Sequence, residues 1–124
     1  MREIKFRGKS LDNGEWFYGF VCFGRDKSDV VIINLTATES ECEKVVPATI
    51  GQFAGLRDKN GKEIYEGDIV KFDNHLQGVS KVLYDSGQYT VESKNYSTAL
   101  TNHIATHTII IGNIHDNPEL LKTE

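Results

Sequence analysis

Apolar and polar positions alternate in short runs along this chain, which is the pattern of half-buried β-strands. Ile4-Lys5-Phe6-Arg7 is the first such run, and Val79–Tyr84 and Gln88–Glu92 are later ones. Two further stretches, Val30–Ile33 and Thr106–Ile114, are rich in consecutive β-branched residues and predict buried strands. The pattern predicts about ten short strands and little helix.

Turn residues separate these runs at short intervals. Asp12-Asn13-Gly14 predicts a hairpin whose return strand is Glu15–Phe23, because Asn and Gly tolerate the positive φ of a tight turn. Asp58–Lys62 repeats this chemistry, and Glu66-Gly67-Asp68 predicts a corner in which Gly67 adopts a conformation closed to other residues. We interpret this motif as structural, and its defining residues are Asn60, Gly61, Gly67 and Asp68.

The remaining segments carry weaker signals. Thr36–Lys44 is polar and predicts an exposed loop, Val45-Val46 predicts a bridge that ends at Pro47, and Thr49–Ala54 predicts a short strand. Residues 93–105 predict no clear element. Asn117-Pro118-Glu119 has the composition of a helix start, so a final helix of one or two turns is expected. These elements predict a mostly β fold, with a small barrel from about residue 58 onward.

The composition is that of a globular domain. The chain has 124 residues, of which 39% are hydrophobic, so it can bury a core without a disulfide or a metal. Its net charge of −4 disfavours a protein that coats duplex DNA, although a local basic patch stays open. Cys22 and Cys42 form no CxxC motif and indicate reduced thiols. The first residues contain no apolar signal region and no run is long enough to span a bilayer, so a cytoplasmic protein is expected.

Three segments of the sequence together carry a family resemblance. They are Met1–Arg7, Ile50–Val70 and Ile110–Leu121, and with them the chain resembles the YopX family of bacteriophage and prophage proteins. The resemblance implies a mostly β protein whose C-terminal part is an SH3-like barrel. Residues 1–57 are then an N-terminal β subdomain and residues 58–124 an SH3-like barrel with a short C-terminal helix, or both parts form one compact unit. The resemblance implies no accepted activity and no catalytic residues.

Polar clusters give little support to an enzyme. His103 and His107 have the spacing of two metal ligands on one helix face, but they run into a predicted strand without a third ligand nearby. Glu63, Glu66 and Asp68 could perform acid–base chemistry, but they lie in and beside turns, where carboxylates cap the backbone. We therefore expect no enzyme, no cofactor and no metal.

Aromatic residues of the predicted second strand are the best candidates for a binding surface. Trp16, Tyr18 and Phe20 share one face of a strand and Phe17 points to the other. Such a set is either core, a groove for a peptide, or a stacking platform for single-stranded nucleic acid. A platform requires cations beside it, and the candidates for a basic strip are Arg2, Lys5 and Arg7.

Two functions from different classes follow, with a small enzyme of unknown chemistry as a third hypothesis. The first is a non-enzymatic phage or prophage accessory protein that acts in the host cytoplasm and binds a protein partner or its own copies, forming a homo-oligomer through exposed strand edges. The alternative is a nucleic-acid-binding module in phage replication or gene control. The candidate surface in either function comprises Trp16, Tyr18, Arg2, Lys5 and Arg7.

Overall fold

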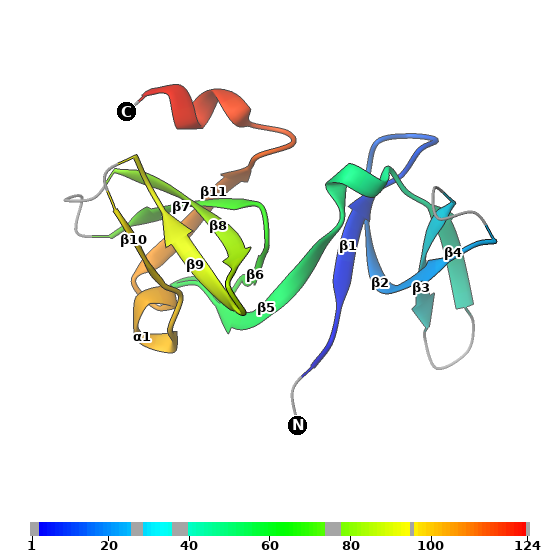
Figure 1. The fold of residues 1–124 in the computed structure, drawn as a ribbon, viewed down its shortest axis with the longest axis horizontal. Helices are drawn as coiled ribbons and strands as arrows, with labels where there is room; N and C mark the ends of the chain where they lie inside the picture. The colour runs from blue at the N-terminus through cyan, green and yellow to red at the C-terminus, as the bar shows by residue number, and fades with distance from the viewer. Residues whose placement is uncertain (1–2, 26–28, 36–39, 74–77, 95, 124) are drawn as a thin grey trace. The chain divides into compact units, whose positions relative to one another are not determined.

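Short antiparallel strands make up most of the molecule (Figure 1). The computed structural model describes residues 3–25, 29–35, 40–73, 78–94 and 96–123. The strands are β1 (Phe6–Lys9), β2 (Trp16–Phe23), β3 (Val30–Leu35), β4 (Ser40–Lys44), β5 (Gly51–Arg57), β6 (Glu63–Tyr65), β7 (Asp68–Phe72), β8 (Val79–Asp85), β9 (Gln88–Glu92), β10 (Ser97–Ala99) and β11 (Thr108–Asn113). The helical elements are the 3₁₀ helix η1 (Pro47–Thr49), the α-helix α1 (Asn102–Ala105) and the 3₁₀ helix η2 (Pro118–Thr123). The predicted mostly β class is confirmed.

The chain divides into two compact units, Met1–Phe53 and Ala54–Glu124. The division lies inside β5, whose first residues pair with β1 and which neighbours β6 in the sheet order. The boundary expected from the sequence lies a few residues later, after Arg57.

In the first unit, consecutive strands pair as a meander in the order β4-β3-β2-β1, followed by β5. All of these pairings are antiparallel. One face of this sheet carries the core, whose buried members Val30 and Ile32 alternate along β3 and pack with Val45. Phe17 and Val21 contribute to the same core from β2, because residues of one strand that are an even number apart share a face.

In the second unit, five strands form an antiparallel sheet in the order β10-β9-β8-β7-β11. The core includes apolar side chains from β6, β7, β8 and β9 together with one residue of α1. Its buried members are Ile64, Val70, Phe72, Val82, Val91, Leu100 and Ala105. The closure of these strands into an SH3-like barrel stays a prediction.

Two sequence-based expectations about local structure are wrong. Residues 40–44 are expected in a loop but form the edge strand β4, which pairs with β3 from Ser40 opposite Leu35 to Lys44 opposite Val31. An edge strand is held by backbone hydrogen bonds on one side and needs few apolar side chains. The polar sequence of β4 therefore gives no alternating pattern from which a strand could be predicted. Residues 93–105, for which no element is predicted, contain β10 and α1. The Thr101 hydroxyl accepts a hydrogen bond from the Ile104 N–H and caps the short helix.

The Asn-Gly hairpins form, but their turns are wider than two residues. Ser10 and Glu15 close the first loop, because the Ser10 N–H donates to the Glu15 carbonyl at 2.9 Å. Gly14 has a φ of +72°, and Asn13 is not among the residues with positive φ. The second loop is closed by Asp58 and Lys62 in the same way. A two-residue turn of the mirror-image type occurs instead after β8, at Ser86 and Gly87, with φ values of 54° and 84°.

The corner after β6 is built as its composition suggests. Gly67 has a φ of +95°, and its N–H donates to the Val82 carbonyl while its carbonyl accepts from the Ile114 N–H, both at 2.8 Å. The buried Asp68 carboxylate accepts a hydrogen bond from the Tyr65 N–H at 2.8 Å and so closes the corner. These bonds satisfy buried backbone groups, which gives the segment a structural role.

The final helix is present as the 3₁₀ helix η2, and a side-chain network precedes it. The Asn113 side chain accepts hydrogen bonds from the N–H groups of His115 and Asp116. The side-chain oxygen of Asn117 accepts from the Asn113 N–H at 3.2 Å. Asn117 therefore tightens the turn before the helix, and its side chain is directed to the end of β11.

Candidate binding surface on the N-terminal sheet

The predicted aromatic and basic residues meet where β1 pairs with β2. Arg7 lies opposite Tyr18 and Lys9 lies opposite Trp16 in the ladder. The guanidinium carbon of Arg7 is 4.5 Å from the centroid of the Trp16 ring, and the ammonium of Lys9 is 5.8 Å from it. Two cations therefore stack on one indole ring, which is a favourable electrostatic arrangement. Lys9 lies outside the strip predicted from the sequence, and Arg2 lies outside the described residues.

The cations of this strip are already engaged within the protein. Arg7 is only 6% exposed. The Lys5 ammonium lies 3.5 Å from the Glu3 carboxylate and 5.5 Å from the centroid of the Phe53 ring. A cation with these surroundings would have to leave a ring or a carboxylate before it could contact a phosphate. The strip is therefore better suited to holding β1 and β2 together than to binding nucleic acid.

A second surface lies beside it on the same sheet and is more accessible. Phe20 lies opposite Ile33, which in turn lies opposite Cys42, and Cys22, Val31 and Lys44 form the parallel row. These residues share the face of the sheet that is opposite to the core. We name this surface the open face, and it comprises Phe20, Cys22, Val31, Ile33 and Cys42 with the rim residues Asp29 and Lys44.

The composition of the open face is unusual for a solvated sheet. An antiparallel sheet with one covered face normally alternates apolar residues inward and polar residues outward. Here the outward positions of β2 and β3 are apolar, and Phe20 is 50% exposed. Tyr18, the next outward residue along β2, is 40% exposed. Tyr18 and Phe20 are thus two neighbouring exposed aromatic side chains, and exposed apolar patches of sufficient area mark interaction sites.

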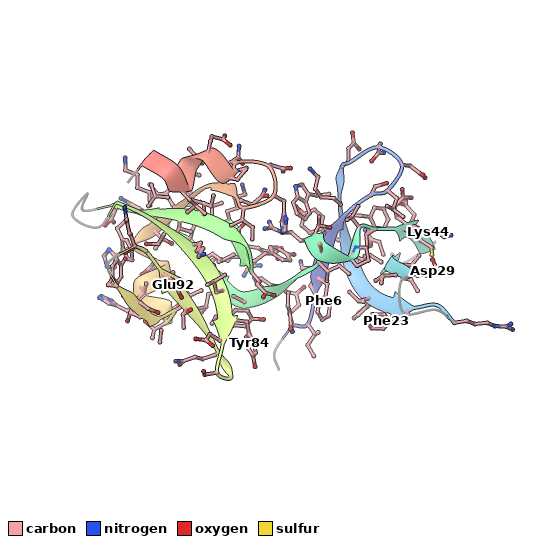
Figure 2. The ribbon with its side chains drawn as sticks, turned by 45° about the horizontal axis from the view of Figure 1, so that its top comes forward. Phe6, Phe23, Asp29, Lys44, Tyr84 and Glu92 are labelled. Atoms are coloured by element: carbon pink, nitrogen blue, oxygen red, sulfur yellow. The ribbon has the colours of Figure 1, made fainter. Side chains whose placement is uncertain are left out.

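One ion pair stands at the rim of the open face. The Lys44 ammonium lies 3.6 Å from the Asp29 carboxylate, and both side chains are about half exposed or more. Figure 2 shows them next to each other, where the ends of β3 and β4 meet. The Lys44 ammonium and the Asp29 carboxylate therefore offset each other at this rim.

The sequence points to part of this surface only. It places Phe20 with Trp16 and Tyr18, but it assigns Val31 and Ile33 to a buried strand and Cys42 to a loop. The uninterrupted apolar run Val30–Ile33 nevertheless indicates that both faces of this strand are apolar, which is typical of strands that are buried on both sides.

Glu63, one member of the carboxylate cluster beside the turns, takes part in contacts within the protein. The Glu63 carboxylate lies 3.4 Å from the Arg57 guanidinium and accepts a hydrogen bond from the Tyr65 hydroxyl at 3.1 Å. Within the described part of the chain no group of three metal-ligating side chains lies together. The carboxylates of the turn motif therefore belong to structural contacts.

The two histidines do come together, at the end of the second unit's sheet. The rings of His103 and His107 are 4.9 Å apart, and Nδ1 of His107 lies 3.3 Å from the Asp73 carboxylate. The Lys59 ammonium lies 3.5 Å from the same carboxylate. The hydrogen bond from His107, together with the charges of His107 and Lys59, holds the pKa of Asp73 below its ordinary value of 3.8, although desolvation opposes the shift.

Comparison with known proteins identifies the family. The family model described as YopX protein matches residues 5–122, and the chain belongs to this family. The chain is similar to protein EF1440 from Enterococcus faecalis, whose crystal structure has a TM-score of 0.66, shares 27% of its residues, and covers 98% of this chain and 99% of that chain. A search of the curated proteins gives no match. No helix in the described ranges is both long and apolar enough to cross a membrane.

Proposed function

We propose that this member of the YopX family is a non-enzymatic β module that binds a protein partner through the open face. The observation that carries the proposal is the pair of exposed aromatic side chains Tyr18 and Phe20 at outward positions of β2, which continues into the half-buried Ile33 of β3. Removing such a surface from water stabilises a complex by roughly 25 cal/mol per Å² of apolar area. The phage or prophage origin of the protein and its action in the host cytoplasm stay predictions from the family resemblance.

The charges of the surface favour a protein over a nucleic acid. Binding of single strands combines aromatic stacking with a positively charged groove that follows the phosphates. Arg7 is nearly buried beneath its stacking contact with Trp16, and Lys44 is accompanied by Asp29 at 3.6 Å. The aromatic component of a nucleic-acid site is present, but an exposed basic track beside it is lacking among the described residues of the open face.

Affinity capture with matched variants tests the proposal. The tagged protein is incubated with bacterial host lysate with and without nuclease, and the same is done for Phe20→Ser and for the control Tyr84→Ser. Tyr84 is 54% exposed and lies on β8 of the second unit, so the control removes an equally accessible aromatic ring elsewhere. We expect nuclease-resistant capture of a protein by the wild type and the control, and loss of that capture in Phe20→Ser.

Two results would contradict the proposal. Capture that nuclease abolishes, together with a steep dependence on salt concentration, would indicate the nucleic-acid alternative, since phosphate contacts release counterions. Capture that persists in Phe20→Ser would show that the partner binds elsewhere on the molecule.

A further inference from the structure

We propose that Asn60 is a site of spontaneous deamidation, at which the backbone nitrogen of Gly61 attacks the asparagine side chain. Asparagine is chemically labile, and glycine has no Cβ to obstruct the close approach of its nitrogen. The chain contains two Asn-Gly sequences, Asn13-Gly14 and Asn60-Gly61, and every other asparagine precedes a residue with a side chain. The inference does not depend on the proposed function of the open face.

The reaction consumes one water molecule and needs no oxidant or cofactor. The Gly61 nitrogen loses its proton to hydroxide and attacks the side-chain carbonyl carbon of Asn60. A bond forms between these two atoms, the bond from that carbon to the side-chain nitrogen breaks, and ammonia leaves after it takes a proton from water. Water then opens the resulting five-membered succinimide ring at either carbonyl. The product is aspartate or isoaspartate at position 60, so an amide and water have become a carboxylate and ammonium.

The charged neighbours of the two Asn-Gly sequences differ in sign. Two lysines flank the second sequence and two carboxylates flank the first: Lys59, Lys62, Asp12 and Glu15. Negative charge develops on the attacking nitrogen and on the carbonyl oxygen, so a nearby cation favours the reaction and a nearby carboxylate opposes it. The Lys59 ammonium lies 3.5 Å from the Asp73 carboxylate, whereas Lys62 is exposed beside the attacking nitrogen in the sequence. Lys62 is therefore the neighbour that should matter most.

The freedom of the two asparagine side chains also differs. The side-chain oxygen of Asn13 accepts a hydrogen bond from the Glu15 N–H at 2.9 Å. Asn60 is exposed, and none of the hydrogen bonds among the described residues involves its side chain. The attacking nitrogens do not discriminate, because the N–H groups of Gly14 and Gly61 each donate to a backbone carbonyl at 3.0 Å. The Asn60 amide can thus turn toward its glycine without breaking a side-chain bond.

Reaction at Asn60 changes the turn that contains it. The Asp58 N–H donates to the Lys62 carbonyl at 2.9 Å, and the Asp58 carboxylate accepts from the N–H groups of Asn60 and Lys62. Isoaspartate inserts an extra carbon into the main chain before Gly61, so Lys62 cannot keep both bonds to Asp58 in their present geometry. The deamidated chain also carries an additional negative charge. We expect the turn to loosen as the protein ages.

Incubation of the folded full chain at mildly alkaline pH, followed by peptide mass spectrometry, tests the proposal. Both sites are measured in one sample, so Asn13 is an internal control. Asn60 should deamidate about fivefold faster than Asn13 or more, because one hydrogen bond fewer to break changes a rate by roughly this factor. In urea with about 1 M salt the two rates should approach each other, because the turns are unfolded and the charges are screened.

Two variants separate the site from its surroundings, and circular dichroism establishes that each is folded. Asn60→Gln should abolish the modification at this position and leave the rate at Asn13 unchanged, since the longer side chain closes a less favourable ring. Lys62→Glu replaces the cation by a carboxylate and keeps the backbone bonds to Asp58, so deamidation at Asn60 should slow several-fold. Amide hydrogen exchange at Lys62 should accelerate on ageing in the wild type and not in Asn60→Gln.

Three results would overturn the proposal. The first is equal rates at Asn60 and Asn13 in the folded protein. The second is an Asn60 that stays intact in the folded protein while the unfolded chain reacts to completion. The third is a rate at Asn60 that does not change in Lys62→Glu, because the neighbouring charge would then not select the site.

Discussion

The Asp58 carboxylate accepts a hydrogen bond from the Ile110 N–H at 3.0 Å, which joins residues that are 52 positions apart in the chain. The other oxygen of the same carboxylate accepts from the N–H groups of Asn60 and Lys62, each at 2.9 Å. Asp58 is 5% exposed, so three backbone donors depend on one buried side chain. The Asn-Gly turn is therefore organised by its first residue, which also fixes the turn to β11.

Asp58→Ala should destabilise the second unit by about 3 kcal/mol or more, because three backbone N–H groups lose their acceptor. Asp58→Asn keeps one acceptor oxygen and should cost less. Amide hydrogen exchange at Asn60, Lys62 and Ile110 reports the loss directly. Unchanged protection at Ile110 in Asp58→Ala would contradict the role assigned to this carboxylate.

Gly67→Val should lower the free energy of unfolding of the second unit by about 1–3 kcal/mol, because a β-branched residue is strained at a φ of +95°. A Cβ at this position would meet Ile114 and His115 at 3.7–3.8 Å, which is ordinary contact, so backbone strain and not crowding causes the loss. Chemical denaturation followed by hydrogen exchange in the second unit measures it. Gly67→Asn is the matched control and should cost less, since Asn tolerates positive φ better than Val.

Gly19→Ala should disrupt the pairing of β2 with β3. An added Cβ would lie 2.1 Å from the Ile33 carbonyl oxygen, so the two strands must separate. Fluorescence of Trp16, the single tryptophan, reports unfolding of the first unit in urea. We expect the free energy of unfolding of Gly19→Ala to be lower than that of the wild type by about 2 kcal/mol or more. Gly14 also has a positive φ, but an added Cβ would meet no atom within 4 Å. The control Gly14→Ala should therefore lower the free energy of unfolding by only about 1 kcal/mol. Equal losses for the two variants would show that close approach at Gly19 is unimportant.

Ser86→Asn should stabilise the protein by about 0.5–1 kcal/mol, because Asn is preferred over Ser at the first position of this turn type. Ser86 is the one non-glycine residue with positive φ in the described part of the chain, at 54°. Thermal or urea unfolding measures the change. Ser86→Val should have the opposite sign, and a Val variant as stable as the wild type would exclude this turn geometry.

The pKa of Asp73 should rise toward 3.8 in His107→Ala, since the hydrogen bond and the positive charge of His107 hold it down. A carboxyl whose pKa is lowered by folding contributes stability above its unfolded pKa and loses it as the pH falls through the folded value. The contribution is thus present above about pH 4 and is lost below it. Carboxyl carbon chemical shifts during an acid titration give the pKa in both proteins. The control His103→Ala removes the neighbouring ring but keeps the bond to Asp73, and it should change the pKa less.

Strand positions could be predicted from the sequence where apolar periodicity or turn chemistry was strong. The corner at Gly67 and the β8–β9 hairpin follow from local composition, because positive φ and alternation are local properties. β4 could not be predicted, since its place depends on a backbone ladder with β3 and its own side chains are polar. The loop lengths of the two Asn-Gly hairpins also escaped prediction, because Asp58 and Ser10 hold wider turns through contacts that the sequence does not state.

For the candidate surface, the sequence indicates which residues alternate along β2 but not how deeply each side chain is buried. The alternation of Trp16, Tyr18 and Phe20 placed them on one face, but the burial of Arg7 depends on tertiary packing that no spacing reveals. The same limit applies to the open face. Which side of β3 carries the core is decided by Val45 and by residues of β2, and only the fold shows that Val31 and Ile33 point away from it.

The pairing order of the first sheet has a consequence for how the chain folds as it is synthesised. The strands β1, β2, β3 and β4 each pair with their neighbour in sequence, so this meander can form once little more than its own residues have left the ribosome. The second unit cannot be completed so early, because β7 pairs with β11 and the Asp58 carboxylate accepts its hydrogen bond from Ile110, which is synthesised much later. Nascent chains would then carry a folded first sheet, with Phe20 exposed, while the rest of the chain is still being translated.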